Sequence, residues 1–297
     1  MVDVIFLGTS SMVPTKERNH SSLLIRYENH GILIDAGEGT QRQMKIANIP
    51  LTRITKILIT HWHGDHVFGL PGIISSLGAS EYSKTLEIYG PKGTKKYCEA
   101  MFEAFVFDKR IGLKITEIKQ GKFFENDDFI LEAMELDHGI PTFGYSFIEK
   151  DKRRIDVKEV KKLGIPEGPL LGKLQDGKNI EFKGKKVTSE ETTYIVKGKK
   201  ISLIADTSPC KNCHTLAKDA DLLICEATFT SKLEEKGAEY GHMTAKQAAL
   251  IANKANVKKL FLNHLSARYK TPQEIVEEAQ TYFHNSKVAE DFMKIKV

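Results

Sequence analysis

Short apolar runs alternate along this chain with segments whose apolar residues recur at helical spacing. We predict strands from the runs, because they are rich in β-branched residues and bounded by polar or glycine-containing turns. Strands are expected at 4–7, 22–27, 32–34, 54–59, 86–89, 113–118, 129–136, 142–148, 192–196, 200–205, 221–225 and 260–262, with a closing strand at the chain's end. Helices are expected at about 40–48, from 69–72 onward, and at 93–107, 214–218, 245–255 and 272–284. This alternation is typical of an α/β fold.

Five of the predicted strands finish in an acid or a histidine. The residues at or just after these strand ends are Asp35, His61, Asp137-His138, Asp206 and His264. In layered α/β proteins, ligand sites collect at the carboxyl ends of strands, where rigid elements present side chains to a common crevice. The repeated ending therefore predicts one shared site.

Side chains that can bind a metal are most closely spaced in His61-Trp62-His63-Gly64-Asp65-His66, directly after the run 54–59. Three imidazoles and a carboxylate are costly to bury unless something pairs with them, and a metal ion is the usual partner. These groups suit zinc, manganese or iron. The alternative is a polar loop that happens to be rich in histidine, which the shared strand ends disfavour. Asp35 is expected to accept backbone hydrogen bonds in its own turn rather than to bind metal.

The composition sets broad limits. With 297 residues, 41% of them hydrophobic, the chain can bury one large core or two packed sheets, and we expect a single domain over residues 1–297. The N-terminus leads into a strand without a basic or long apolar segment, and no later run is long enough to span a bilayer, so we expect a cytoplasmic protein.

The four cysteines do not resemble the disulfide framework of a secreted protein. Cys210-Lys211-Asn212-Cys213-His214 matches the spacing of a c-type haem attachment motif. It follows Asp206 where a loop and a helix are expected, and no export signal precedes it, so haem is disfavoured. A packed or surface pair is favoured, and a thiol pair is the other alternative.

Basic residues are concentrated in one region of the chain. The net charge of +5 alone is compatible with an ordinary solvated surface. Residues 150–186, however, carry twelve Lys and Arg against six Asp and Glu, and a Gly- and Pro-rich stretch at 164–172 interrupts the α/β alternation there. We predict that residues 150–189 form an inserted, protruding, basic arm suited to a polyanion.

The histidine motif, followed in order by His138, Asp206 and His264, resembles the metal signature of the metallo-β-lactamase fold. Segments 14–19, 226–228, 241–244 and 264–269, with the arm carrying Gly168-Pro169, are similar to ribonuclease Z within that superfamily. Ribonuclease Z enzymes are endonucleases that remove the 3′ trailer from precursor tRNA and leave a 3′ hydroxyl. The resemblance implies a four-layer αββα sandwich with an inserted arm.

The resemblance also implies two zinc ions per subunit. One ion would be bound by His61, His63 and His138, the other by Asp65, His66 and His264, with Asp206 bridging them. Seven ligands shared by two ions leave a coordination position on each for a common water. A metal-bridging hydroxide would then attack phosphorus in line, with Asp65 as the general base. Manganese or iron could occupy the same ligands.

The leaving ribose oxygen needs a proton. His242 lies where a helix is predicted to begin, capped by Thr244, and from its position alone we expect a capping or core histidine. The resemblance instead implies that His242 donates this proton and that Glu226 orients it. Many ribonuclease Z sequences carry histidine at the position of Cys225, where this chain departs from the family.

Several residues and the arm gain expected RNA contacts from the resemblance. Lys16, Arg18 and Arg268 would contact RNA phosphates or the 3′ end. The arm would bind the tRNA body at a distance from the cut. In the family, the arm of one subunit commonly serves the active site of the other, which implies a homodimer. The alternatives are solvated surface loops, a related hydrolase of small phosphodiesters or thioesters, and a non-catalytic RNA-binding protein.

Overall fold

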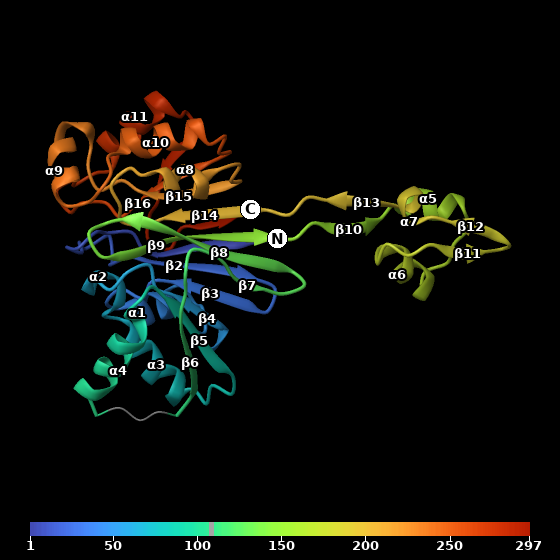
Figure 1. Cartoon of the computed structure of the whole chain (residues 1–297), viewed down its shortest axis with the longest axis horizontal. Helices are drawn as coiled ribbons and strands as arrows, with labels where there is room; N and C mark the ends of the chain where they lie inside the picture. Colours follow the sequence, from blue (N-terminus) through green and yellow to red (C-terminus); the bar gives the residue numbers. More distant parts are fainter. Residues whose placement is uncertain (107–109) are drawn as a thin grey trace.

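The computed structural model describes residues 1–106 and 110–297 and contains two stacked β-sheets (Figure 1). Over these residues, the first sheet has the order β18-β1-β2-β3-β4-β5-β6. Its strands are β18 (Lys294–Lys296), β1 (Asp3–Gly8), β2 (Ser22–Tyr27), β3 (His30–Ile34), β4 (Lys56–Leu58), β5 (Thr85–Gly90) and β6 (Gly112–Glu117). The pairs from β3 to β6 are parallel and the pairs among β18, β1, β2 and β3 are antiparallel.

The second sheet has the order β17-β16-β15-β14-β9-β8-β7 within the described ranges. Its strands are β17 (Ser286–Val288), β16 (Leu260–Asn263), β15 (Leu222–Glu226), β14 (Lys200–Ile204), β9 (Pro141–Glu149), β8 (Phe129–Asp137) and β7 (Gly121–Glu125). The pairs from β14 to β17 are parallel, and β9, β8 and β7 extend the sheet in antiparallel order. Both sheets are therefore mixed.

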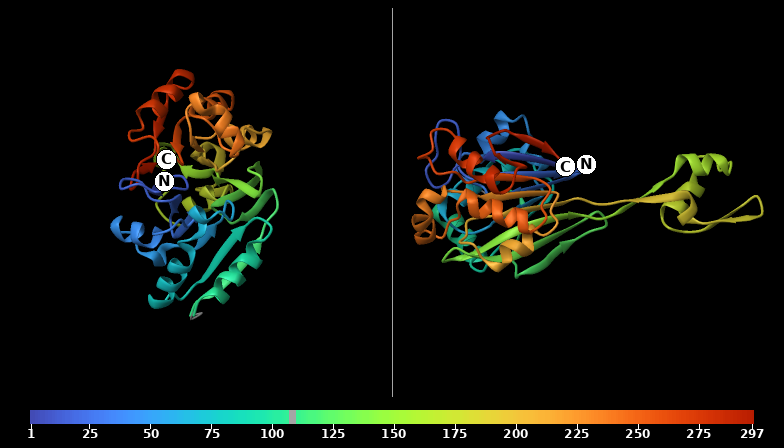
Figure 2. Two further views of the ribbon diagram at one scale, coloured as in Figure 1. Left: turned by 90° about the vertical axis from the view of Figure 1, so that its left-hand side faces the viewer. Right: turned by 90° about the horizontal axis from the view of Figure 1, so that it is seen from above.

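Helices cover the outer face of each sheet (Figures 1 and 2). On the first sheet they are α1 (Thr40–Ile46), α3 (Leu70–Ala79) and α4 (Thr94–Ala104). On the second they are α8 (Lys211–Ala217), α10 (Ala245–Lys254) and α11 (Gln273–Tyr282). The short elements α2 (Gly64–Val67), η1 (Leu51–Arg53), η2 (Ser231–Leu233) and α9 (Glu234–Glu239) complete the body. The four-layer αββα sandwich is confirmed.

The apolar runs are continuous in the central strands because both faces of those strands are buried. In β1, Val4 and Phe6 pack between the sheets, whereas Ile5 and Leu7 pack beneath the helices. Side chains alternate in direction along a strand, so a strand in the middle of four layers needs apolar residues at every position. In the described part of the chain, no helix combines the length and apolar character needed to cross a bilayer.

The arm leaves the second sheet between β9 and β14 (Figures 1 and 2). Its neck is the antiparallel pair of β10 (Lys152–Ile155) and β13 (Thr193–Val196). Its tip contains α5 (Val157–Lys162), α6 (Pro169–Gln175), β11 (Ile180–Phe182), β12 (Lys185–Val187) and α7 (Ser189–Thr192). The tip has its own small core of Val160, Ile165, Leu174, Ile180 and Val187. The strand expected at 192–196 thus belongs to the neck, and the projecting segment runs to Val196, beyond the expected end at residue 189.

The helix predicted at 93–107 ends earlier than expected, and the one predicted at 214–218 begins earlier, since α8 starts at Lys211. Helix α4 ends at Ala104, and residue 107, the predicted end, lies outside the described residues. Met101 and Phe102 pack against the core between the first sheet and its helices, but Phe105 does not, because it is 60% exposed beyond the helix end.

Candidate metal centre

The seven predicted ligands come together at one edge of the sandwich. Six of them are buried, and His63 is half-buried. They come from the segment after β4, from α2, from the turn between β8 and β9, and from the ends of β14 and β16. The strand ends named by the sequence pattern therefore do converge, as predicted.

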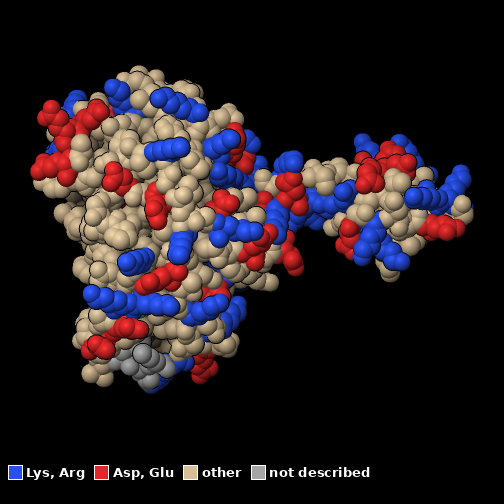
Figure 3. Space-filling view, viewed as in Figure 1, with Lys and Arg blue, Asp and Glu red and all other residues tan. Residues whose placement is uncertain are grey.

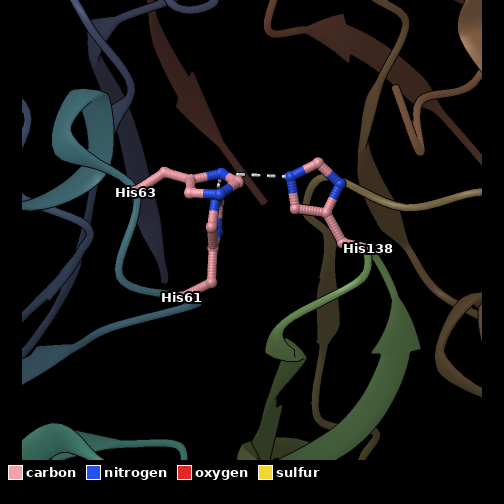
Figure 4. Close-up of side chains that lie close together, drawn as sticks. All are labelled: His61, His63 and His138. Atoms are coloured by element: carbon pink, nitrogen blue, oxygen red, sulfur yellow. Dashed lines mark hydrogen bonds between the residues drawn. The ribbon is translucent and has the colours of Figure 1, made fainter. Parts of the chain in front are cut away.

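Three histidines form the first group (Figure 4). His63 Nδ1 lies 3.1 Å from His61 Nε2 and 3.2 Å from His138 Nε2. A tetrahedral ion bound at about 2.0–2.1 Å separates its ligand atoms by roughly 3.3 Å. The three nitrogens therefore have the spacing of ligands to one ion.

Asp65, His66, Asp206 and His264 form the second group. Asp65 Oδ2 lies 3.4 Å from Nε2 of both His66 and His264. Asp206 Oδ2 lies 3.4 Å and 3.2 Å from the same two nitrogens. It is also 3.9 Å from Nε2 of His61 and of His138 in the first group. Asp206 is thus the carboxylate positioned between the two groups.

Four of the histidines are oriented through Nδ1, the nitrogen that faces away from the centre. The hydrogen-bond partners are Thr60 Oγ1 for His61 at 3.0 Å, Asp35 Oδ2 for His66 at 2.7 Å, the Gly241 carbonyl for His138 at 2.8 Å, and Thr228 Oγ1 for His264 at 3.1 Å. A carboxylate or carbonyl can only accept, so Nδ1 of His66 and His138 carries the proton. Their Nε2 lone pairs are then directed at the centre, as metal ligation requires.

Asp35 controls two of these histidines. It accepts a hydrogen bond from His66 Nδ1–H directly, and its Oδ2 also accepts a 2.8 Å hydrogen bond from the Thr60 hydroxyl. Because that hydroxyl donates to Asp35, it accepts from His61 Nδ1. The backbone N–H bound by Asp35 belongs to Thr60, two residues after β4, and not to its own turn as expected, because the side chain points across to the segment that follows β4.

Glu226 occupies the matching position on the other sheet. Its Oε1 lies 3.1 Å from His242 Nδ1, and its Oε2 accepts a 2.8 Å hydrogen bond from the Thr228 hydroxyl. That hydroxyl therefore accepts from His264 Nδ1. Each sheet thus supplies one buried carboxylate that holds one histidine directly and a second through a threonine.

His242 was not expected at the site from its position alone. Its Nδ1 lies 4.0 Å from Asp206 Oδ2, and its ring is 5.1 Å from that of His138. Thr244, not His242, caps α10, with its side chain accepting from Gln247 N–H. The prediction of a capping or core histidine is therefore wrong, since the turn before α10 brings the ring over the metal groups.

The charges of these groups suit a divalent cation. Burial would raise the pKa of Asp65 and Asp206, but the imidazoles of His264 and His66 hold both pKa values below their ordinary range. Burial also lowers the pKa of His61 and His63. Asp206 and Asp35 outweigh burial and raise the pKa of His66, so a cation there would compete with a proton for Nε2.

Unpartnered atoms support the fit. Among the described residues, Asp65 Oδ1 and His66 Nε2 are buried without a hydrogen-bond partner. A buried polar atom without a partner is costly, and a cation would remove that cost. The clustered nitrogen and oxygen donors therefore constitute a site for divalent metal.

We expect Thr228→Val to weaken metal binding by about 10- to 100-fold with little change in fold. Val keeps the volume of the side chain but lacks the hydroxyl that links the Glu226 carboxylate to His264 Nδ1 by hydrogen bonds. The apparent zinc affinity, measured by competition with a chelator, checks this. Thr230→Val is the matched control, since that buried hydroxyl contacts Tyr269 rather than a ligand histidine. Equal affinities for the two variants would contradict the relay.

The remaining predicted residues have different surroundings. Lys16 is exposed, and Arg268 is exposed and lies over the Phe229 ring. Arg18 is half-buried and donates to Thr9 Oγ1 and to the Ala289 carbonyl, so it anchors its own loop.

Gly168 and Pro169 are exposed at the start of α6, where Gly168 has φ +140°, a value that favours glycine. They lie at the arm tip, apart from the metal groups.

The cysteines lie outside the metal centre. Cys225 is buried in the core beneath the helices, so the departure at this position does not touch the site. Cys213 is also fully buried, which leaves no access for attachment of a haem vinyl group.

Fold and site together define a metal-dependent hydrolase of the metallo-β-lactamase class, and residues 15–146 match the Metallo-beta-lactamase superfamily. The chain is 40% identical to the ribonuclease Z of Methanothermobacter thermautotrophicus, over 100% of this chain and 97% of that one. It is also 40% identical to the ribonuclease Z of an Exiguobacterium species, covering 98% of each. The short form of human tRNase Z is similar in structure, with a TM-score of 0.73, 29% identity and 99% coverage of both chains. The chain therefore belongs to the ribonuclease Z family.

Proposed function

We propose that this enzyme removes the 3′ trailer from precursor tRNA by phosphodiester hydrolysis and leaves a 3′ hydroxyl on the tRNA. The proposal rests mainly on the position of Asp206 Oδ2, which lies 3.2–3.9 Å from histidine nitrogens of both ligand groups. The chain also matches ribonuclease Z over its whole length. A single metal site would not need a carboxylate at that position. Two ions side by side suit the attacked and leaving oxygens of a phosphodiester.

The proposed cofactors are two zinc ions, with manganese or iron as alternatives for the same ligands. His61, His63 and His138 would hold one ion, Asp65, His66 and His264 the other, and Asp206 both. Bound there, the ions would activate a water at neutral pH and offset the charge that develops on phosphate.

Asp65 is the proposed general base. One of its oxygens faces His66 and His264, while the other is buried and unpartnered among the residues described. That second oxygen can accept a proton from the attacking water. The carboxylate is ionised because the neighbouring imidazoles keep its pKa low.

His242 is the proposed proton donor to the ribose 3′ oxygen. Burial disfavours its charged form, but the Glu226 carboxylate, with help from Asp206 and Asp65, raises the pKa of His242 to about 9. Glu226 engages Nδ1, which leaves Nε2 to carry the proton that the leaving oxygen receives. A protonated imidazole at neutral pH is the form that general acid catalysis needs.

His242→Ala is expected to lower turnover of precursor tRNA by about 10²-fold while metal content is retained, because the ribose oxygen then leaves unprotonated. Hydrolysis of bis(p-nitrophenyl) phosphate, whose leaving group needs no proton, should change far less. The two rates and the metal content, measured on one preparation, check this. His214→Ala, at an exposed histidine, is the control. Equal losses on both substrates would remove the assignment.

The surfaces around the site suggest how RNA is held. The loop containing Lys16 and the segment containing Arg268 are joined through a bridge between Ser10 and Leu265 and a hydrogen bond from Ser11 N–H to the Leu265 carbonyl. We assign Lys16 and Arg268 to RNA phosphates near the cut, with Arg18 holding the loop in place.

Figure 3 displays Lys and Arg side chains along the neck and tip of the arm. The arm, with Gly168 and Pro169 at its tip, is the proposed contact to the tRNA body. Because an arm projecting this far from its own site can reach the site of another subunit, we also propose a homodimer. Because precursor tRNA is the proposed substrate, we also propose that the enzyme acts in the cytoplasm.

The test is incubation of metal-loaded enzyme with a precursor tRNA that carries a 3′ trailer, followed by mapping of the cut, with Asp65→Ala as control. We expect one cut beside the discriminator nucleotide, a 3′ hydroxyl on the tRNA, and no cut by the variant. Intact RNA together with hydrolysis of a small phosphodiester or thioester would overturn the substrate assignment.

A further inference from the structure

Two cysteines lie side by side where the loop that follows Asp206 enters α8. Cys210 precedes α8 and is half-buried, and Cys213 is buried in the first turn of that helix. Their Sγ atoms are 3.5 Å apart, and both are free thiols. The proposed reaction uses neither of them.

The two sulfurs differ from each other and from the remaining cysteines. Hydrogen bonds from the Cys213 thiol, from the backbone N–H groups of Cys213 and Asn212, and from Thr207 lower the pKa of Cys210 to about 5. The thiolate at Cys210 raises the pKa of Cys213. Burial raises the pKa of Cys98 to about 12 and puts that of Cys225 well above its ordinary value. Cys210 is therefore the nucleophilic thiolate, and Cys213 a thiol held beside it.

We propose that Cys210 and Cys213 form a reversible dithiol–disulfide site that hydroperoxides oxidise. The Cys210 thiolate attacks the peroxide, the O–O bond breaks, and a sulfenic acid forms as hydroxide or alkoxide leaves. The Cys213 sulfur then displaces the sulfenic oxygen, which departs as water with the thiol proton, and an S–S bond forms. The two sulfurs lose two electrons in total, and the peroxide gains both.

The site is linked to the metal centre through Thr207. Thr207, whose side chain helps to lower the pKa of Cys210, donates its N–H to Glu226 Oε1 at 2.8 Å, and its hydroxyl oxygen accepts a 2.9 Å hydrogen bond from the Asp137 N–H beside His138. Disulfide formation shortens the sulfur separation from 3.5 Å to about 2.05 Å. Cys213 is fixed in the core, so Cys210 must move and disturb Thr207. Oxidation should therefore lower the turnover of precursor tRNA several-fold. This effect on turnover rests on the proposed function, whereas formation of the disulfide is independent of it.

The experiment treats the reduced whole protein with hydrogen peroxide and counts free thiols after denaturation. We expect the count to fall from four to two, a peptide pair linked through Cys210 and Cys213 by mass spectrometry, and full recovery with dithiothreitol. A count that stays at four, or oxidation that reaches Cys98 and Cys225 equally, would overturn the site.

A second variant separates the disulfide from its effect on turnover. Cys213→Ser retains the reactive Cys210 but cannot form the bond, so its cleavage of precursor tRNA should not show the reversible loss seen in the oxidised wild type. A wild-type disulfide that forms with unchanged cleavage would overturn the link to the metal centre. Failure of the reduced enzyme to cut precursor tRNA would instead count against the proposed function.

Discussion

Asp206→Asn is expected to lower kcat/KM for precursor tRNA by more than about 10³-fold and to reduce the metal bound per chain. Asn keeps the size of the side chain but removes the charge from the one carboxylate shared by both ligand groups. Four imidazole nitrogens would then face an uncharged amide, and two cations held side by side would lose the anion between them. Metal analysis and single-turnover cleavage measure the two effects.

The control for this substitution is Asp127→Asn, which removes one negative charge from an exposed position in the turn between β7 and β8, at the end of β8 opposite to His138. It should leave both metal content and cleavage unchanged. If Asp206→Asn retained two ions per chain and cut RNA at the wild-type rate, the bridging role would be excluded, even though the fold and family would stand.

The fold was largely predictable because a strand that is buried on both faces appears in the sequence as a continuous apolar run. Leu222 and Ile224 in β15 pack between the sheets, while Leu223 and Cys225 pack beneath the helices, so the strand appears in the sequence as an uninterrupted apolar run. Such runs show where the central strands lie. They do not determine the strand order, and the short strand β7, with partly exposed residues, has no such run and was not predicted.

The metal groups were also predictable, because acids and histidines follow directly after buried runs and the ends of those strands meet. The residues that orient them were harder to find. Thr60 and Thr228 are ordinary residues at strand ends, and only their distances to histidine Nδ1 and to a carboxylate reveal the relay. His242 follows no strand, so its place depends on the turn before α10.

Amino-acid composition predicted that the arm exists but not where it ends. Its charge and its Gly and Pro content predicted an insertion, but its end depends on backbone pairing, since β13 completes a ribbon with β10 instead of joining the sheet. No change in composition marks Val196 as the last residue of the neck.

Deletion of residues 152–196 is expected to lower kcat/KM for precursor tRNA by about 10³-fold, while hydrolysis of bis(p-nitrophenyl) phosphate stays within about twofold of wild type. The first substrate loses the phosphate contacts of the arm, and the second never reaches it. The two chain ends already meet, because Asp151 accepts hydrogen bonds from Lys197 and from Gly198 N–H. A two-residue glycine-containing turn can therefore join them without disturbing β9 and β14.

Salt dependence distinguishes lost contacts from a damaged body. The full-length enzyme should bind precursor less tightly as salt rises, and the shortened enzyme should respond with a shallower slope, because fewer phosphates are neutralised. An unchanged melting temperature of the body would be expected, since the arm tip packs around its own core. An unchanged salt slope would mean that the basic residues of the arm are a solvated surface and that the tRNA body is held elsewhere. Equal losses on both substrates would mean that the deletion damages the catalytic body, and would contradict a role of the arm in binding alone.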